Sequence, residues 1–338
     1  MPLTTVDQGL LSTNAQYTGF KNRIINGAMM IWQRGTSFAA LGTGVYSADR
    51  WKTTIAGTSV SVTATQDTSV PSVAFEYSLK YQQITSNATS VTEYATRQAF
   101  ELANVYDLAG QSVTLSFWYR SNIVGTHGVR ILPLGTTGGV DTSVAITVNT
   151  ANTWEYKTVT TTALSAITSW GATADNGQAL IVDIGLRVNG VGQTTVNVND
   201  NFQVTGVQLE KGSTATSFDY RPYGTEMALC ERYFQRCGAW NGAANNSTNW
   251  LGVVSVRTTM RTTPSISATG PLTISNFYTA DPTQSSLSLA ILGSDTSTMS
   301  ICFWMFNFSG LTGGAYYAGS RAPGGIGVGN HIQLIAEL

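Results

Sequence analysis

The chain has 338 residues, of which 42% are hydrophobic and 11% are charged, and its 18 basic and 19 acidic side chains give a net charge of -1. This length is sufficient for two or three domains with hydrophobic cores, and the charged share is less than half of the roughly 25% typical of soluble proteins. The near-neutral balance argues against nucleic acid or an anionic membrane surface as a partner. Because the sequence contains neither a long apolar run nor the pattern of an export signal, we expect synthesis in the cytoplasm without membrane insertion.

The N-terminal segment is polar and shows no sustained periodicity over residues 1–22. Such a segment is ordered only by something that it binds, so we expect an extended arm. An Asn-Gly pair then separates the apolar residues 24–25 from the apolar residues 29–32. This arrangement predicts a short hairpin at the entrance to the first domain.

Alternation of apolar and polar residues, which is typical of strands, dominates the next part of the chain. Phe75 begins one alternating run with Tyr77, and Trp118 and Arg120 lie on the face opposite the apolar face of another run. About nine such strands, separated by turn signals, predict an all-β fold, most simply a jelly-roll β-sandwich, over residues 23–222.

A single helix is predicted after this sandwich, as a linking helix over residues 223–238. Thr225 is a plausible N-cap and Gly238 a stop signal. The apolar stripe has spacings of three, four and three residues and consists of Met227, Cys230, Phe234 and Cys237. The alternation then resumes, so residues 239–338 are expected to form a smaller C-terminal β-sandwich, in which the doubly apolar run 299–308 is buried on both faces.

Signatures of catalysis and of metal binding are weak. The three cysteines form no metal or redox motif, and neither histidine lies in a context typical of nucleophilic catalysis. We therefore expect no enzyme activity and no cofactor. A structural Ca²⁺ ion at Asp175 or Asp200 stays an alternative, although no Asp-rich loop supports it.

Aromatic and amide side chains favour binding over catalysis. Flat aromatic faces combined with planar hydrogen-bonding groups suit sugars, and the chain joins both kinds of side chain at low charge. In the first sandwich the candidate residues are Trp118, Arg120, Trp154, Tyr156 and Trp170. In the C-terminal part they are Trp240, Asn245, Trp250, Tyr316 and Tyr317.

Three segments resemble phage tail-fibre and receptor-binding proteins. They are NRIINGAMMIWQRGTSF with the following YSADRW, then VTLSFWYRSN, and finally VTGVQLEKGSTATSFDYRPYGTEMALCERYFQR. The resemblance implies a jelly roll of the carbohydrate-binding-module type, a homotrimer and a place in the virion. The expected partners are then another virion protein at the arm and a host surface polysaccharide or other receptor. In a trimer the helical stripe would pack either around the threefold axis or on its own sandwich.

Two other functions stay open. One is a structural capsid or tail fibre without a dedicated receptor. The other is an enzyme that cleaves surface polysaccharide with paired carboxylates, although the repeating pattern of a β-helix is missing. Its candidate acids are Glu76, Glu93, Glu101, Asp107 and Asp183.

Overall fold

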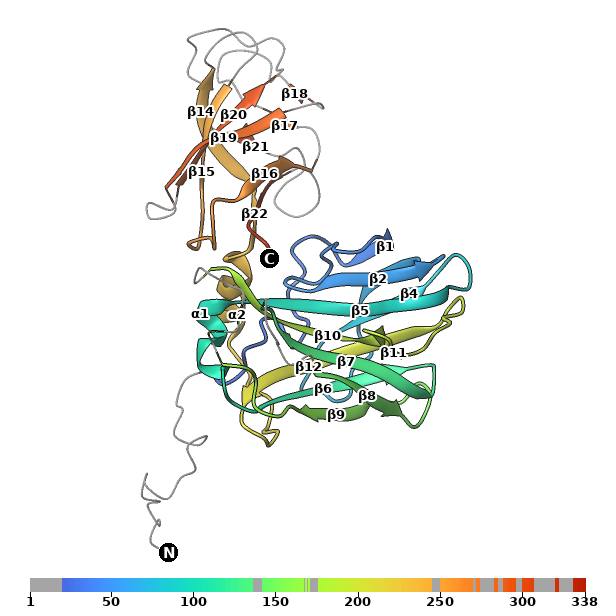
Figure 1. Cartoon of the computed structure of the whole chain (residues 1–338). Helices are drawn as coiled ribbons and strands as arrows, with labels where there is room; N and C mark the ends of the chain where they lie inside the picture. The colour runs from blue at the N-terminus through green and yellow to red at the C-terminus, as the bar shows by residue number, and fades with distance from the viewer. Residues whose placement is uncertain are drawn as a thin grey trace, which may run out of the picture. The chain divides into compact units, whose positions relative to one another are not determined.

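The computed structural model divides the chain into two compact units (Figure 1). The first comprises Met1–Glu226 with Leu338, and the second comprises Met227–Glu337. The structure describes residues 20–135, 142–166, 168, 170, 176–244, 250–269, 272–273, 283–284, 288–295, 300–306, 320–321 and 331–338.

The first unit is a sandwich of two antiparallel sheets. In spatial order the first sheet contains β1 (Ser37–Leu41), β3 (Val62–Asp67), β4 (Ser78–Gln83), β12 (Asn201–Lys211), β6 (Val113–Ser121) and β9 (Glu155–Thr160). The second sheet contains β2 (Lys52–Thr58), β5 (Thr89–Glu101), β10 (Gln178–Val188), β7 (Gly125–Pro133) and β8 (Thr142–Val148), with β11 (Val191–Gly192) beside β10. Two short helical turns, α1 (Leu102–Val105) and η3 (Tyr106–Leu108), follow β5. The predicted all-β jelly-roll sandwich is confirmed.

The alternation in the sequence accounts for the core between the two sheets. On β6, Leu115, Phe117 and Tyr119 are at most 1% exposed and belong to one apolar cluster with residues of the opposite sheet. Successive strand residues point to opposite faces, so Trp118 and Arg120 lie on the outer face of the first sheet. That outer face carries the candidate site.

The predicted hairpin at residues 24–32 is wrong, because this segment contains no strand. Asn26 has a left-handed φ of 58°. Its side-chain amide donates to the carbonyls of Ile31 at 2.9 Å and Asp49 at 3.0 Å, and its side-chain oxygen accepts from the Ile31 amide. The side chain of Asn26 therefore takes the place of a partner strand and folds the segment into a loop.

The predicted linking helix is shorter than the sequence suggested. Helix α2 spans Tyr223–Glu231, and Phe234–Cys237 form strand β13, which pairs with β22 (Ile332–Ile335). The predicted stripe therefore is not one helical face. Phe234 is fully buried and Cys237 is 4% exposed within the chain itself, so neither presents a free surface for a threefold axis. Pairing with a strand about a hundred residues away overrides the local helical spacing.

The second unit is also built from antiparallel strands. Its three-stranded sheet contains β13, β22 and β16 (Ser265–Ala268). A five-stranded sheet contains β19 (Ser288–Asp295), β20 (Ser300–Phe306), β15 (Trp250–Ser255), β14 (Ala239–Ala244) and β21 (Ser320–Arg321), and β17 (Leu272–Thr273) pairs with β18 (Thr283–Gln284). Strand β20 lies between β19 and β15, with Ile301 and Phe303 buried. No helix in the described ranges has the length and apolar character needed to cross a membrane.

Candidate functional site

Two aromatic side chains stand together on the outer face of the first sheet. Trp118 on β6 is directly opposite Tyr156 on β9, and their ring centroids are 5.3 Å apart with the planes inclined at 55°. Tyr156 is 45% exposed. The prediction that Trp118 lies on the outer face is therefore confirmed, and the structure brings Trp118 and Tyr156, both predicted binding residues, into one aromatic wall.

Residues from two loops form a second aromatic wall. Phe75 comes from the loop 68–77 between β3 and β4, and Phe218 and Tyr220 come from the segment that follows β12. Phe218 lies edge to face with both neighbours, at 5.4 Å from Phe75 and 5.2 Å from Tyr220. The Tyr220 hydroxyl donates to the carbonyl of Ala74, which ties the two loops together. Such edge-to-face clusters hold aromatic side chains in defined positions.

The interpretation of Phe75 as one of the alternating apolar residues of a strand is wrong. Strand β4 begins only at Ser78, and Phe75 is not part of the core cluster between the sheets. It is nevertheless only 7% exposed, because Phe218 and Tyr220 pack against it. Its burial therefore belongs to the loop wall.

Gly206 lies between the two walls on β12. The register between β12 and β6 shifts between Thr205 and Gln208, and Gly206 has a left-handed φ of +62° within this bulge. A Cβ atom at this position would lie 2.7 Å from Cζ of Phe75 and 3.2 Å from Cδ1 of Trp118. The close approach of both rings to the backbone therefore requires glycine at residue 206.

The walls enclose a groove of about 460 Å³. Its lining is mostly aromatic. The polar groups of the lining side chains are hydroxyl groups and the indole N–H of Trp118. The lining residues are Ala74, Phe75, Ser116, Trp118, Tyr156, Gly206, Ser217, Phe218 and Tyr220. A groove of this size with a few hydrogen-bonding groups can hold a small molecule or one unit of a polymer.

One carboxylate adjoins this groove. A hydrogen bond to Glu76 and the charge of Glu76 raise the pKa of Tyr77. Burial, together with the same negative charge, raises the pKa of Tyr220. The Tyr220 hydroxyl therefore keeps its proton at neutral pH and stays a hydrogen-bond donor.

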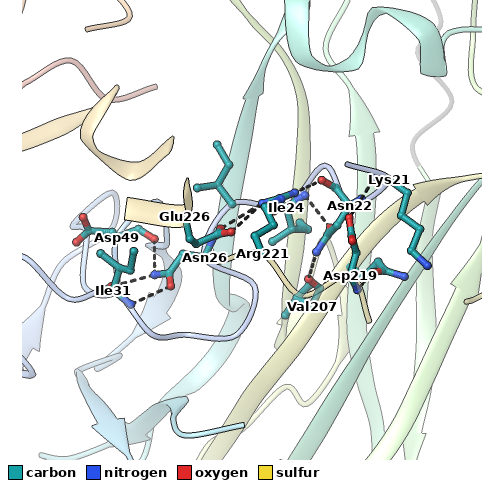
Figure 2. Close-up of polar contacts among 12 residues, drawn as sticks. Lys21, Asn22, Ile24, Asn26, Ile31, Asp49, Val207, Asp219, Arg221 and Glu226 are labelled. Atoms are coloured by element: carbon teal, nitrogen blue, oxygen red, sulfur yellow. Dashed lines mark hydrogen bonds and ion pairs between the residues drawn. The ribbon is translucent and has the colours of Figure 1, made fainter. Parts of the chain in front are cut away.

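A buried polar network holds the loop wall in place (Figure 2). The Arg221 guanidinium donates to the carbonyl of Ile24 at 2.9 Å, to Glu226 at 3.0 Å and to the carbonyl of Asn22. The Asn22 side chain donates to the carbonyl of Val207 at 3.1 Å. The network thus links three places that are far apart in the sequence: the loop after the arm, strand β12 and the start of α2.

The segment after β12 is fixed on the sheet by two further contacts. Glu210 is 3% exposed and accepts from the backbone amide of Thr216 at 2.9 Å and from its hydroxyl at 2.7 Å. Gln208 accepts from the backbone amide of Asp219 at 2.7 Å. These bonds place Ser217 and Phe218 over the outer face.

The other predicted binding residues have different positions. Trp154 precedes β9, and its indole N–H donates to the hydroxyl of Ser69 at 3.4 Å, which ties the loop 68–77 to β9. Trp170 is buried in the core between the sheets, and its indole N–H donates to the carbonyl of Ser165, so the prediction of a surface contact there is wrong.

The C-terminal binding candidates are only partly placed. Trp240 lies on β14 and Trp250 on β15. Asn245, Tyr316 and Tyr317 lie outside the described residues. Their role in binding stays a prediction.

Two of the candidate acids are paired with arginines. Asp183 is fully buried and makes a two-pronged ion pair with Arg97, at 2.6 and 2.8 Å. Asp107 pairs with Arg23 at 2.8 Å. These contacts explain both carboxylates as partners of arginines.

The structure describes one of the two candidate ligands for a metal ion. Asp200 accepts from the backbone amide of Asn197 at 2.7 Å, and Asp175 lies outside the described residues. Across the described residues, no group of three or more His, Cys, Asp or Glu side chains is arranged to hold a metal ion.

Comparison with known proteins gives only distant likenesses. No protein-family model and no curated protein matches the chain. Among solved structures, the enzymatically active domain of tailspike protein 4 from bacteriophage CBA120 is 16% identical, with a TM-score of 0.34 over 57% of this chain and 22% of that chain. The chain thus resembles less than a quarter of the tailspike's length.

Carbohydrate-binding modules are also among the similar structures. The family 11 module of the cellulase Lic26A-Cel5E from Clostridium thermocellum is 11% identical, with a TM-score of 0.31 over 53% of this chain and 97% of that chain. TmCBM61, solved in complex with β-1,4-galactotriose, is 13% identical, with a TM-score of 0.29 over 48% of this chain and 88% of that chain. At these scores no ligand or site residue is transferred to this chain.

Proposed function

We propose that the first unit is a saccharide-binding module and that the groove between Trp118 and Tyr220 is its binding site. The observation that carries the proposal is the groove itself, in which two aromatic walls flank hydroxyl groups. The C–H face of a sugar ring packs on an aromatic ring, while its hydroxyl groups need hydrogen-bonding partners. Ser116 and Ser217 supply such partners beside the rings.

The aromatic walls also suit such a ligand energetically. Phe75 and Phe218 are held by their edge-to-face contacts before any ligand binds, so little side-chain entropy is lost on binding. Tyr156 and Tyr220 are 45% and 48% exposed, which leaves their rings available for contact with a ligand.

We further propose that the module belongs to a virion appendage that contacts the host cell surface. The support is the resemblance of the three sequence segments to phage tail-fibre and receptor-binding proteins. In this proposal residues 1–22 attach the chain to another virion protein, the assembly is a homotrimer, and the saccharide is bound without being cleaved.

The binding proposal is tested with the full chain on an array of bacterial surface polysaccharides. Trp118→Ala and Tyr156→Ala should each weaken binding about tenfold, because removal of a central aromatic contact commonly costs more than 1 kcal/mol. Tyr106→Ala is the matched control, since Tyr106 on η3 is 59% exposed and does not line the groove. Equal binding by all three variants would overturn the assignment of the groove.

The appendage proposal is tested by deleting residues 1–21, which leaves Asn22 and its bonds in the buried network in place. The shortened chain should keep its fold and its oligomeric state but should no longer join the particle. Normal incorporation into particles would refute the role of the arm. If the complete chain joins particles but binds no surface polysaccharide, the chain is a structural fibre.

A further inference from the structure

Beyond the groove, the outer face of the first sheet carries a row of polar side chains on three neighbouring strands. Gln203 on β12 is opposite Lys80 on β4 and opposite Arg120 on β6. The residues on either side of Lys80, Leu79 and Tyr81, are fully buried in the core. Lys80 therefore points outward, on the same face as Arg120 and the groove.

The two cations in this row have no acidic partner. Arg120 donates from Nε to the carbonyl of Asn152 at 2.8 Å and from Nη1 to Oε1 of Gln203 at 2.7 Å, and both acceptors are uncharged. In the described part of the chain, the side chain of Lys80 makes no hydrogen bond or ion pair. Neither cation of the row therefore makes an ion pair with a described residue.

Several other arginines of the chain are used differently. Arg97 pairs with Asp183 at 2.6 Å, Arg221 with Glu226 at 3.0 Å, and Arg257 with Glu231 at 2.6 Å. Lys80 and Arg120, which lie on either side of β12, differ from these three arginines in having no acidic partner among the described residues. The two neutral acceptors hold the Arg120 guanidinium in place and leave N–H groups for an external acceptor.

The row adjoins the aromatic wall. Arg120 follows Trp118 by two residues on the same face of β6, which corresponds to about 7 Å along the strand. Lys80 and Arg120 are separated by one strand, which corresponds to about 10 Å between their backbones. Both long side chains can therefore reach a substituent on a saccharide unit next to the one that packs on Trp118.

We propose that Arg120 and Lys80 form a subsite for an anionic substituent, a carboxylate or a phosphate, of the bound saccharide. This inference rests on the proposed function and narrows its ligand to an acidic polysaccharide. The negative charge of Glu76, near Tyr220, would repel an anionic substituent at the Tyr220 end of the groove. The ligand is therefore oriented with its negative group toward Arg120.

The test uses an array on which each bacterial surface polysaccharide is printed in three forms. One form is native, one has its carboxylates reduced to alcohols, and one has been treated with hydrofluoric acid to remove phosphate. The wild-type chain should bind a native acidic polysaccharide. Its affinity for the treated form that lacks the negative group should be lower by about tenfold or more. The treated form that loses binding distinguishes a carboxylate from a phosphate.

Substitutions connect this charge preference to the row. Lys80→Gln should weaken binding of the acidic form about three- to fivefold, as expected for one exposed charge contact, and Lys80→Arg should restore it. Arg120→Lys should weaken binding as well, because lysine lacks the planar fork of arginine. Lys52→Gln is the matched control, since it removes the same charge from β2 in the second sheet.

The outcomes separate this inference from the proposed function. If native and uncharged forms bind equally and only Trp118→Ala weakens binding, the groove binds saccharide but the anionic subsite is wrong. If no polysaccharide binds in any form, the proposed function and this inference both fail. Affinity should also fall as salt rises from about 0.01 M to 1 M, where the screening length shrinks from about 30 Å to 3 Å. Affinity for the acidic form that does not change over this range would overturn the charge contact.

Discussion

Substitution of Gly206 by alanine is the sharpest test of how the groove is built. The left-handed backbone at φ +62° costs a non-glycine residue about 1–2 kcal/mol. The new Cβ atom would also lie 2.7 Å from Cζ of Phe75, and overpacking of this kind costs about 1–3 kcal/mol. After the smaller entropy of the unfolded alanine chain is included, we expect Gly206→Ala to lower the free energy of unfolding by about 2–4 kcal/mol.

Gly110→Ala separates the two contributions. Gly110 has a similar φ of +69°, but no atom lies within 4 Å of the position that its Cβ would occupy. This control should therefore lose only the backbone contribution, about 1 kcal/mol after the smaller entropy of the unfolded alanine chain is included. The difference between the two variants measures the steric conflict with Phe75 and Trp118.

Urea titration followed by near-ultraviolet circular dichroism measures both free energies, and the polysaccharide array measures the effect on the groove. Gly206→Ala should weaken saccharide binding, because Phe75 or Trp118 must move, whereas Gly110→Ala should leave binding unchanged. Equal destabilisation by both variants, with binding intact in both, would refute the conclusion that Phe75 and Trp118 lie too close to residue 206 for any side chain.

Three further predictions concern burial and assembly. Burial lowers the pKa of His127 from 6.5 to about 4, so between these pH values the unfolded chain binds a proton that the folded chain excludes. The contribution of His127 to the free energy of unfolding is therefore complete above pH 6.5 and falls by about 3 kcal/mol in total as the pH drops to 4. Urea titrations across this range should show the loss in the wild type and not in His127→Gln. Arg221→Met should lower the free energy of unfolding by about 3–5 kcal/mol, because it leaves Glu226, whose side chain is 13% exposed, without its cation. Arg23→Met breaks a pair with Asp107, whose side chain is 41% exposed, and should cost at most about 1 kcal/mol. Equal losses in urea titrations would contradict the buried network. Light scattering should give the mass of three chains for the wild type. Phe234→Asp should unfold the second unit, as measured by circular dichroism, because Phe234 is fully buried. If this variant instead separates into folded monomers, Phe234 lies at a subunit interface.

Burial lowers the pKa of His127, and its hydrogen bonds show which ring nitrogen carries the proton. Its Nε2 lies 3.1 Å from the carbonyl of Ile123, which can only accept, so Nε2 carries the proton of the neutral ring. Nδ1 then accepts from the Tyr119 hydroxyl at 2.9 Å. A second proton on the ring would take this hydrogen bond away and place a charge in a fully buried site.

The sequence predicted the sandwich because alternation is a local signal that the core obeys. Trp118 faces outward for the same reason that Phe117 and Tyr119 face inward, so half of the aromatic groove could be predicted from β6 and β9 alone. The other half could not. Phe75 alternates with Tyr77 in the sequence, but β4 starts at Ser78, and only the contact with Phe218 shows that Phe75 belongs to a loop.

The helix prediction failed for a related reason. Phe234 and Cys237 continue the helical spacing of Met227 and Cys230, and nothing nearby in the sequence breaks it before Gly238. Their backbone groups instead pair with β22, close to the C-terminal end of the chain. A contact between residues so distant in the sequence leaves no trace in a local pattern.

The residues that carry the resemblance to phage fibre proteins divide into two kinds in the structure. Asn22, Asn26 and Arg221 are buried or nearly so and bond to backbone carbonyls or to other side chains within the chain. They fix the loop wall. Trp118 and Arg120, in contrast, reach the outer face. Under the proposed function, Asn22, Asn26 and Arg221 therefore maintain the scaffold, whereas the choice of saccharide depends on the side chains that lie beside Trp118. If this division is right, Arg221→Met should lower stability without changing which polysaccharide the folded protein prefers, whereas Lys80→Gln should change that preference at unchanged stability.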